Sequence, residues 1–156
     1  MTEISLVEVP SMNVLGIRKT GTYALIPELL LKVFMYIQKR KAAVAGPPLF
    51  LCHEISPAAV VEAEEKGTAA VEVAWPVNEA VKGTKEITAY VLPGGRMAHV
   101  VHKGPYATCE PTYLALFTWI TEHNLTICGP VREVYPNDPR VVSPDEIITD
   151  IYVPVR

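Results

Sequence analysis

Glu133 is the side chain whose type and position point most directly to chemistry. The surrounding segment reads as a strand, so Val131, Glu133 and Tyr135 share one face. A carboxylate between an apolar and an aromatic side chain is unusual if that face is solvated. It could supply the counter-charge for a cation in a pocket. The alternative is an edge-strand acid that faces water or pairs with Arg132 or Arg156.

The chain contains the same unit twice. Residues 14–54 align with residues 97–137 at an offset of 83, which superimposes Gly21-Thr22-Tyr23 on Gly104-Pro105-Tyr106. After a loop that is five residues longer in the first copy, the offset falls to 78. A repeat of this length indicates two like structural units packed together.

The two copies differ where a pocket could be lined. Glu133 aligns with Phe50, and Val153 aligns with Trp75, so one copy is acidic where the other is aromatic. A ring face for the body of a ligand and a carboxylate for its charge would together recognise an apolar cation. The candidate ligand-binding residues are Glu133, Trp75, Phe50, Tyr113, Tyr135 and Tyr106.

Metal and cofactor chemistry is not indicated. His99 and His102 fall in a predicted strand, where a spacing of three places their rings on opposite faces. The cysteines, Cys52, Cys109 and Cys128, form no CxxC pair. Cys109 lies near a predicted helix N-terminus, which could lower its pKa, but no base partner follows. We predict neither a metal site nor a cofactor.

The elements that position these residues are short strands and two helices. Ile26, Leu30, Val33 and Ile37 form an apolar stripe at helical spacing, and the second helix should span about 110–123. Residues 10–13 should form a hairpin or tight connection, and residues 93–95 a hairpin turn. Strands are expected at about 3–9, 13–19, 49–54, 68–75, 87–92, 96–102, 131–135 and 146–153.

The predicted fold is α+β, a tandem pseudo-twofold repeat of β-α-β-β units. We expect a single domain over residues 1–156, with repeat 1 at about 3–77 and repeat 2 at about 87–155. About eight antiparallel strands would carry two helices on one face, leaving a ligand cleft on the other side at the seam. The long loop 56–66 is expected to be solvated, with a helical turn through 58–64 as an option.

Composition narrows the class of protein. The chain has 156 residues, 49% of them apolar and 20% charged, with a net charge of -3. Lys39-Arg40-Lys41 reads as a set of cations favoured at a helix C-terminus, so we expect no direct nucleic-acid binding. No apolar stretch is long enough for a membrane span and no signal peptide is evident, which predicts a cytoplasmic protein. Nothing in the sequence specifies an oligomeric state.

The two G-x-Y motifs and the closing segments resemble the GyrI-like small-molecule-binding family. The segments are Glu133-Val134-Tyr135-Pro136-Asn137-Asp138-Pro139 and Thr149-Asp150-Ile151-Tyr152-Val153-Pro154-Val155. The resemblance covers nearly the whole chain. It implies two β-α-β-β repeats and a cleft for lipophilic, often cationic or planar aromatic compounds, with Glu133 as the acidic pocket residue. Phe50, Trp75, Tyr113 and Tyr135 would line that cleft.

Three functions follow from this resemblance. The same module is the effector-binding domain of AraC-type and multidrug-responsive transcription regulators, so the first is a small-molecule-binding protein for sensing, sequestration or resistance. Because Met1 opens almost directly into the first strand, we do not expect a complete regulator of that type. Some members hydrolyse cyclopropane-bearing toxins, which makes Glu133 a candidate general base. The third is a protein-interaction inhibitor acting through Glu62, Glu64 and Glu65.

Overall fold

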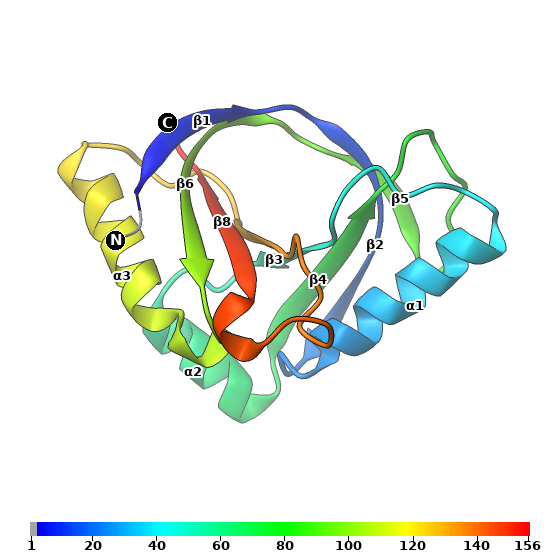
Figure 1. Ribbon diagram of the computed structural model, residues 1–156, viewed down its shortest axis with the longest axis horizontal. Coiled ribbons are helices and arrows are strands. Elements are labelled where there is room, and N and C mark those ends of the chain that lie inside the picture. Colours follow the sequence, from blue (N-terminus) through cyan, green and yellow to red (C-terminus); the bar gives the residue numbers. More distant parts are fainter. Residues whose placement is uncertain (1–2) are drawn as a thin grey trace. The chain divides into compact units, whose positions relative to one another are not determined.

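The structure is a computed structural model that describes residues 3–156 (Figure 1). The chain divides into two compact units. The Phe50 unit is Ser11–Pro93, and the Glu133 unit combines the described part of Met1–Pro10 with Gly94–Arg156. The Glu133 unit is therefore assembled from both ends of the chain.

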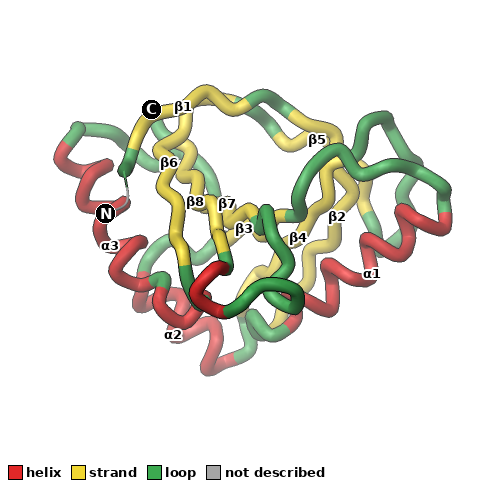
Figure 2. Tube along the Cα trace, in the orientation of Figure 1, coloured by secondary structure: helices red, strands yellow, loops and turns green. Residues whose placement is uncertain are grey.

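The Phe50 unit is a four-stranded antiparallel sheet with two helices (Figure 2). Its strands run in the order β3-β4-β2-β5. The helix α1 packs on β4 and β2 and buries Leu29, Val33 and Ile37 against them. The elements are β2 (Met12–Gly21), α1 (Leu25–Lys39), β3 (Leu49–Cys52), α2 (Pro57–Lys66), β4 (Ala69–Pro76) and β5 (Thr88–Leu92).

The Glu133 unit repeats this arrangement with one long helix. Its strands run in the order β1-β6-β8-β7, and α3 packs on β6 and buries Leu116 and Ile120. Two short 3-10 turns, Tyr106–Thr108 and Pro144–Glu146, lie in its loops. The elements are β1 (Ser5–Val9), β6 (Gly95–Lys103), α3 (Glu110–Glu122), β7 (Val131–Val134) and β8 (Ile148–Pro154).

The strand pairing repeats at the two offsets that the sequence shows. Phe50 pairs with Val73 in one unit, and Glu133 pairs with Ile151 in the other. The same offsets of 83 and 78 relate every pair that these two ladders share. The predicted α+β fold, built from a tandem repeat with antiparallel strands, is confirmed.

The leading strand of each copy pairs away from its own neighbour in the chain. β1 precedes β2 but pairs with β6, while β5 precedes β6 but pairs with β2. The two exchanges share one register, because Ser5 faces His99 as Thr88 faces Gly16. Only residues 10–11 separate β1 from β2, but these strands do not pair with each other, so a hairpin there is wrong, as is the hairpin turn predicted at residues 93–95. Alternation of apolar residues predicts a strand and does not name its partner.

A third α-helix replaces the solvated loop expected at residues 56–66. Ser56 caps α2 by accepting a hydrogen bond from the backbone N–H of Ala59 at 3.1 Å, and Pro57 opens its first turn. Gly67 ends α2 in the left-handed conformation, with φ of 65°. The prediction of two helices is therefore corrected to three α-helices in residues 3–156.

The acids of α2 are partly engaged within the Phe50 unit. Glu64 accepts a hydrogen bond from the backbone N–H of Tyr23 at 3.0 Å, and Glu62 pairs with Lys66 one turn later. The acidic surface proposed for a protein-interaction inhibitor is thus built partly from structural contacts. None of the helices described in residues 3–156 has both the length and the apolar composition needed to cross a bilayer.

Candidate functional site: a carboxylate held by phenols

Glu133 lies in β7 on the face of the sheet that carries α3. Its pairing partner Ile151 is fully buried, and Tyr113 of α3 donates its hydroxyl to Glu133 Oε2 in a very short hydrogen bond. Tyr135, two residues along the chain, donates to Oε1 at 2.9 Å. Each carboxylate oxygen therefore accepts from one phenol. The sequence placed the cleft away from the helices; within this unit the acid faces the helix.

Two further side chains lie around this carboxylate. The ring of Tyr106 meets that of Tyr135 edge-on, with centroids 5.7 Å apart. Tyr106 is 41% exposed, so its ring forms the solvent-accessible part of the cluster. Cys109, at the start of α3, is buried, and the charge of Glu133 contributes to the raised pKa of its thiol. We call Tyr106, Cys109, Tyr113, Glu133 and Tyr135 the phenol-carboxylate cluster.

Burial and the Glu133 charge keep the acidic protons of this cluster in place. Burial raises the pKa of Tyr135 well above its usual value, and the charge of Glu133 and the hydrogen bond to it raise it further. The pKa of Tyr106 is raised by burial and then by Glu133. Burial and Glu133 raise the pKa of the Cys109 thiol to about 12. The lowered pKa expected from the helix N-terminus is wrong, because loss of solvent outweighs the helix dipole.

His102 fixes the backbone that carries the tyrosines, a role that the sequence analysis missed. It is 6% exposed, and its Nε2 lies 3.0 Å from the carbonyl oxygen of Pro105. A carbonyl only accepts, so Nε2 carries the proton and Nδ1 accepts the hydroxyl of Thr112 at 2.9 Å. One ring thus joins β6 to the Tyr106 turn and to the first turn of α3. Only the pattern H-x-x-H drew attention to it.

A family comparison identifies the domain. The model of the GyrI-like small molecule binding domain matches residues 2–156. The chain belongs to this family. No curated protein sequence matches the chain significantly.

Several solved structures share the fold at low sequence identity. The EcmrR C-terminal domain superimposes with a TM-score of 0.78 at 22% identity, covering 100% of this chain and 98% of that one. The EcmrR-DNA complex in EcmrR-RPo gives a TM-score of 0.86 at 21% identity. There the match covers 99% of this chain, which spans 57% of the EcmrR chain.

Two further solved structures with this fold are a hydrolase and a protein bound to an organic cation. A hydrolase from Listeria innocua encoded by lin2189 gives a TM-score of 0.71 at 15% identity, covering 99% of this chain and 92% of that one. SAV2435 bound to tetraphenylphosphonium gives 0.60 at 12% identity, with coverages of 99% and 94%. At these identities the likeness establishes the fold.

Four of the six predicted site residues of this GyrI-like domain come together, and two lie in the other unit. Phe50 is 4% exposed and packs edge-on against Tyr23 with ring centroids 6.0 Å apart. Trp75 donates its indole N–H to the carbonyl of Leu30 at 2.9 Å and packs on Phe34. Both side chains lie between strand and helix α1 in the Phe50 unit. Their role as cleft walls stays a prediction.

Each unit carries an imidazole–carboxylate pair in which the acids, but not the histidines, occupy equivalent positions of the repeat. His53 lies 2.7 Å from Glu72, which also accepts the hydroxyl of Tyr90 at 2.5 Å. His99 lies 2.8 Å from Asp150, the equivalent of Glu72 at the offset of 78. His99 and His102 thus point to opposite faces, as predicted. A hollow of about 220 Å³ beside Glu72 is lined by Gly16, Ile17, Arg18, Glu72, Thr88 and Tyr90.

These pairs do not form a metal centre of the usual composition. Within residues 3–156, no group of three or more His, Cys, Asp and Glu side chains is arranged to hold a metal ion. No disulfide joins the cysteines within residues 3–156, and Cys52 and Cys109 are buried.

Proposed function

We propose that the phenol-carboxylate cluster of this small-molecule-binding domain binds a lipophilic organic cation. The observation that carries the proposal is the set of side chains that surround Glu133. Glu133 is only partly exposed, accepts hydrogen bonds from the hydroxyls of Tyr113 and Tyr135, and forms no ion pair within residues 3–156. Neutral donors leave the carboxylate its full charge, and removal from water makes that charge costly without a counter-ion. A bound cation would supply the counter-ion.

The rings around Glu133 suit an apolar cation better than a metal ion or an amine. Tyr106 and Tyr135 offer ring faces, whose negative charge density attracts a cation. Both oxygens of Glu133 already accept hydrogen bonds, so a cation without N–H groups leaves no donor unsatisfied. The tetraphenylphosphonium bound to SAV2435 is a cation of this kind. Phe50 and Trp75 are not needed for this site.

Matched ions of one shape and opposite charge test the proposal. Calorimetric titration should show binding of tetraphenylphosphonium and none of comparable strength for tetraphenylborate. Glu133→Gln keeps the shape and hydrogen-bonding of the side chain but removes its charge, and should weaken tetraphenylphosphonium binding at least tenfold, roughly 1.4 kcal/mol.

The control variant is Glu54→Gln, which neutralises the carboxylate that Tyr23 contacts in the Phe50 unit. It should change the dissociation constant less than twofold. Equal affinity of wild type and Glu133→Gln for tetraphenylphosphonium would reject the proposal, as would equal binding of tetraphenylborate.

Hydrolysis of an electrophilic cyclopropane is the second candidate, because a phenol and a carboxylate in direct contact can move protons. Glu133 would take a proton from water as the water oxygen attacks the strained ring carbon. The electrons of the breaking C–C bond would pass to a conjugated carbonyl oxygen, which takes a proton from the Tyr113 hydroxyl. Mass spectrometry should then find substrate plus one water, with turnover lost in Glu133→Gln. Stoichiometric binding without this product leaves only the binding function.

A further inference from the structure

The helices α1 and α3 end with the same backbone geometry. Lys41 and Asn124, at equivalent positions, both adopt the left-handed conformation, with φ of 58° and 56°. The next residue closes each end in the same way, Ala42 N–H to Ile37 and Leu125 N–H to Ile120, both at 3.1 Å. The fold therefore requires one kind of helix end at both places.

The residues at the two ends are nevertheless very different. α1 ends in Lys39-Arg40-Lys41, whereas α3 ends in Glu122-His123-Asn124. The helix dipole favours cations at a C-terminus, but α3 adopts the same end without a lysine or arginine. Lysine is also less suited than asparagine to the left-handed conformation of position 41. Helix-end chemistry alone therefore does not account for the three cations of α1.

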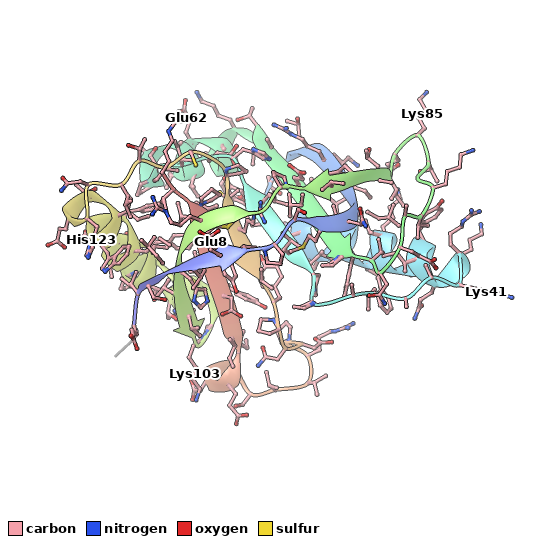
Figure 3. The ribbon with its side chains drawn as sticks, turned by 90° about the horizontal axis from the view of Figure 1, so that it is seen from above. Glu8, Lys41, Glu62, Lys85, Lys103 and His123 are labelled. Atoms are coloured by element: carbon pink, nitrogen blue, oxygen red, sulfur yellow. The ribbon has the colours of Figure 1, made fainter. Side chains whose placement is uncertain are left out.

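A second basic segment lies against the same end of α1. The hydroxyl of Tyr36 donates to the carbonyl oxygen of Lys82 at 2.6 Å, and Lys32 forms an ion pair with Glu86. These two contacts fix the loop between β4 and β5 on the helix. Figure 3 draws Lys41 and Lys85 at separate places on the outside of the Phe50 unit, with their side chains pointing away from it in different directions.

The resulting surface is basic in a protein of net negative charge. Its five cations are exposed, and within residues 3–156 none of them forms an ion pair: Lys39, Arg40, Lys41, Lys82 and Lys85. Glu79 is the acid of this loop that has no such pair within the same residues, while the chain as a whole carries -3. We call these five cations the α1-end surface.

Exposed apolar side chains continue this surface along the helix. Met35 is 60% exposed and lies one turn before Lys39, and Leu31 is 54% exposed one turn earlier. Leu31 and Met35 thus form a short exposed apolar stripe next to the cations at the end of α1. The equivalent of Met35 in α3 is Thr118, whereas Leu31 corresponds to Leu114, which is also exposed, at 68%. Only the Met35 part of the stripe therefore belongs to the first copy alone.

We propose that the α1-end surface binds an acidic, amphipathic helical segment of a partner protein. Carboxylates of the segment would face the five cations, and its apolar side chains would cover Met35 and Leu31. A phosphate backbone would leave the apolar stripe without a partner. The stripe contains no Trp, Tyr or Phe to enter a bilayer interface, which disfavours a membrane.

The test exchanges the end of α1 for that of α3. The variant Lys39→Glu/Arg40→His/Lys41→Asn carries a sequence that already fits this helix end in the same protein. The probe is a labelled synthetic helix with Glu on one face and Leu on the other, measured by fluorescence anisotropy. Wild type should bind it, with affinity falling as salt rises, and the exchange should weaken binding roughly tenfold or more. Met35→Thr should weaken it by a smaller factor.

The matched control is Lys66→Glu/Lys103→Glu, which removes the same amount of charge at residues that are not part of the α1-end surface. It should change the affinity less than threefold. The proposal is overturned if the control weakens binding as much as the exchange, or if an oligoglutamate without leucine binds as tightly. Tighter binding of a DNA duplex, or of phosphatidylserine vesicles, also overturns it in favour of those partners. Circular dichroism confirms that each variant is folded, and tetraphenylphosphonium binding serves as an independent readout at Glu133.

Discussion

The two units place a glutamate in hydrogen-bond contact with a tyrosine by different means. In the Phe50 unit, Glu54 follows β3, accepts the hydroxyl of Tyr23 at 2.7 Å, and also accepts the backbone N–H of Ala70 at 3.1 Å. In the Glu133 unit the acid lies within the strand, at the position equivalent to Phe50, and it accepts hydrogen bonds from two phenols. Tyr106, the equivalent of Tyr23, is left partly exposed.

This difference makes Glu54 a structural carboxylate and leaves Glu133 available to bind a ligand. A backbone N–H ties Glu54 to β4, so moving it would leave buried groups unpaired. The phenols of Tyr113 and Tyr135 sit on side chains that can turn, and their equivalents in the Phe50 unit are Leu30 and Cys52. Equivalent backbone positions thus carry a buried aromatic ring, Phe50, in one unit and a carboxylate, Glu133, in the other.

Moving the acid into the Phe50 unit would break this comparison most severely. Phe50→Glu puts a carboxylate at a site that is 4% exposed, with Leu30 and Cys52 where the phenols would be. We expect the free energy of unfolding to fall by about 3–5 kcal/mol in urea denaturation, because the buried charge has no donor. The conservative Phe50→Leu should cost clearly less. A loss under about 1 kcal/mol for Phe50→Glu would mean that the two positions are interchangeable.

Removing one phenol hydroxyl from each unit sharpens the same comparison. Tyr135→Phe and Tyr23→Phe each delete a hydrogen bond to a carboxylate, which is worth about 1.5–3 kcal/mol in stability. Both should lower the urea midpoint, but only Tyr135→Phe should alter tetraphenylphosphonium affinity. If Tyr23→Phe alters that affinity as much, the phenol-carboxylate cluster is not the binding site.

Most of the fold could be predicted from the sequence because the repeat and the apolar patterns are local signals. The eight strands and both long helices follow from the spacing of apolar residues along the chain, and the two offsets follow from the repeated sequence. The exchange of β1 and β5 could not be predicted in this way, since either strand could pair with its neighbour and keep the same faces. The helix α2 was underestimated because its stability depends on the cap from Ser56 and the end at Gly67.

The site was predicted in part for the same reason. Strand alternation singled out Glu133, and the E-x-Y spacing brings Tyr135 to the same carboxylate. Trp75 and Phe50 were chosen because the two copies differ there, but a difference between copies also arises where one core simply packs another ring. His102 shows the limit most plainly. Its three partners come from a turn and a helix that follow the strand, so no spacing in the strand reveals them.

The thiol of Cys109 reports the charge of Glu133 with a smaller effect. Its pKa is raised from 9.0 to about 12, so the thiol stays protonated and the stability this contributes is complete below pH 9. That stability is lost as the pH rises towards 12. Iodoacetamide at pH 8 should therefore label exposed Cys128 well before Cys109, as followed by peptide mass spectrometry.

Neutralising Glu133 removes one of the two causes of this shift. Glu133→Gln should speed alkylation of Cys109 several-fold while leaving Cys128 unchanged, because burial, the larger cause, remains. Equal rates in wild type and Glu133→Gln would show that the carboxylate does not act on the thiol. The Phe50 unit offers the control in Cys52, whose alkylation should not respond to Glu133→Gln.

The smallest expected effect concerns the two helix ends. Lys41 and Asn124 share the left-handed conformation, which asparagine tolerates better than lysine. Lys41→Asn should therefore raise the free energy of unfolding by about 0.5–1 kcal/mol, and Asn124→Lys should lower it by a similar amount. Both substitutions are measured by urea denaturation at high salt, which suppresses the change in charge repulsion. If Lys41→Asn stabilises the domain yet weakens the acidic helix, position 41 carries a cation for binding at a cost in stability. If instead Lys41→Asn destabilises it, the cation belongs to the fold, and the contrast between the two helix ends loses its functional meaning.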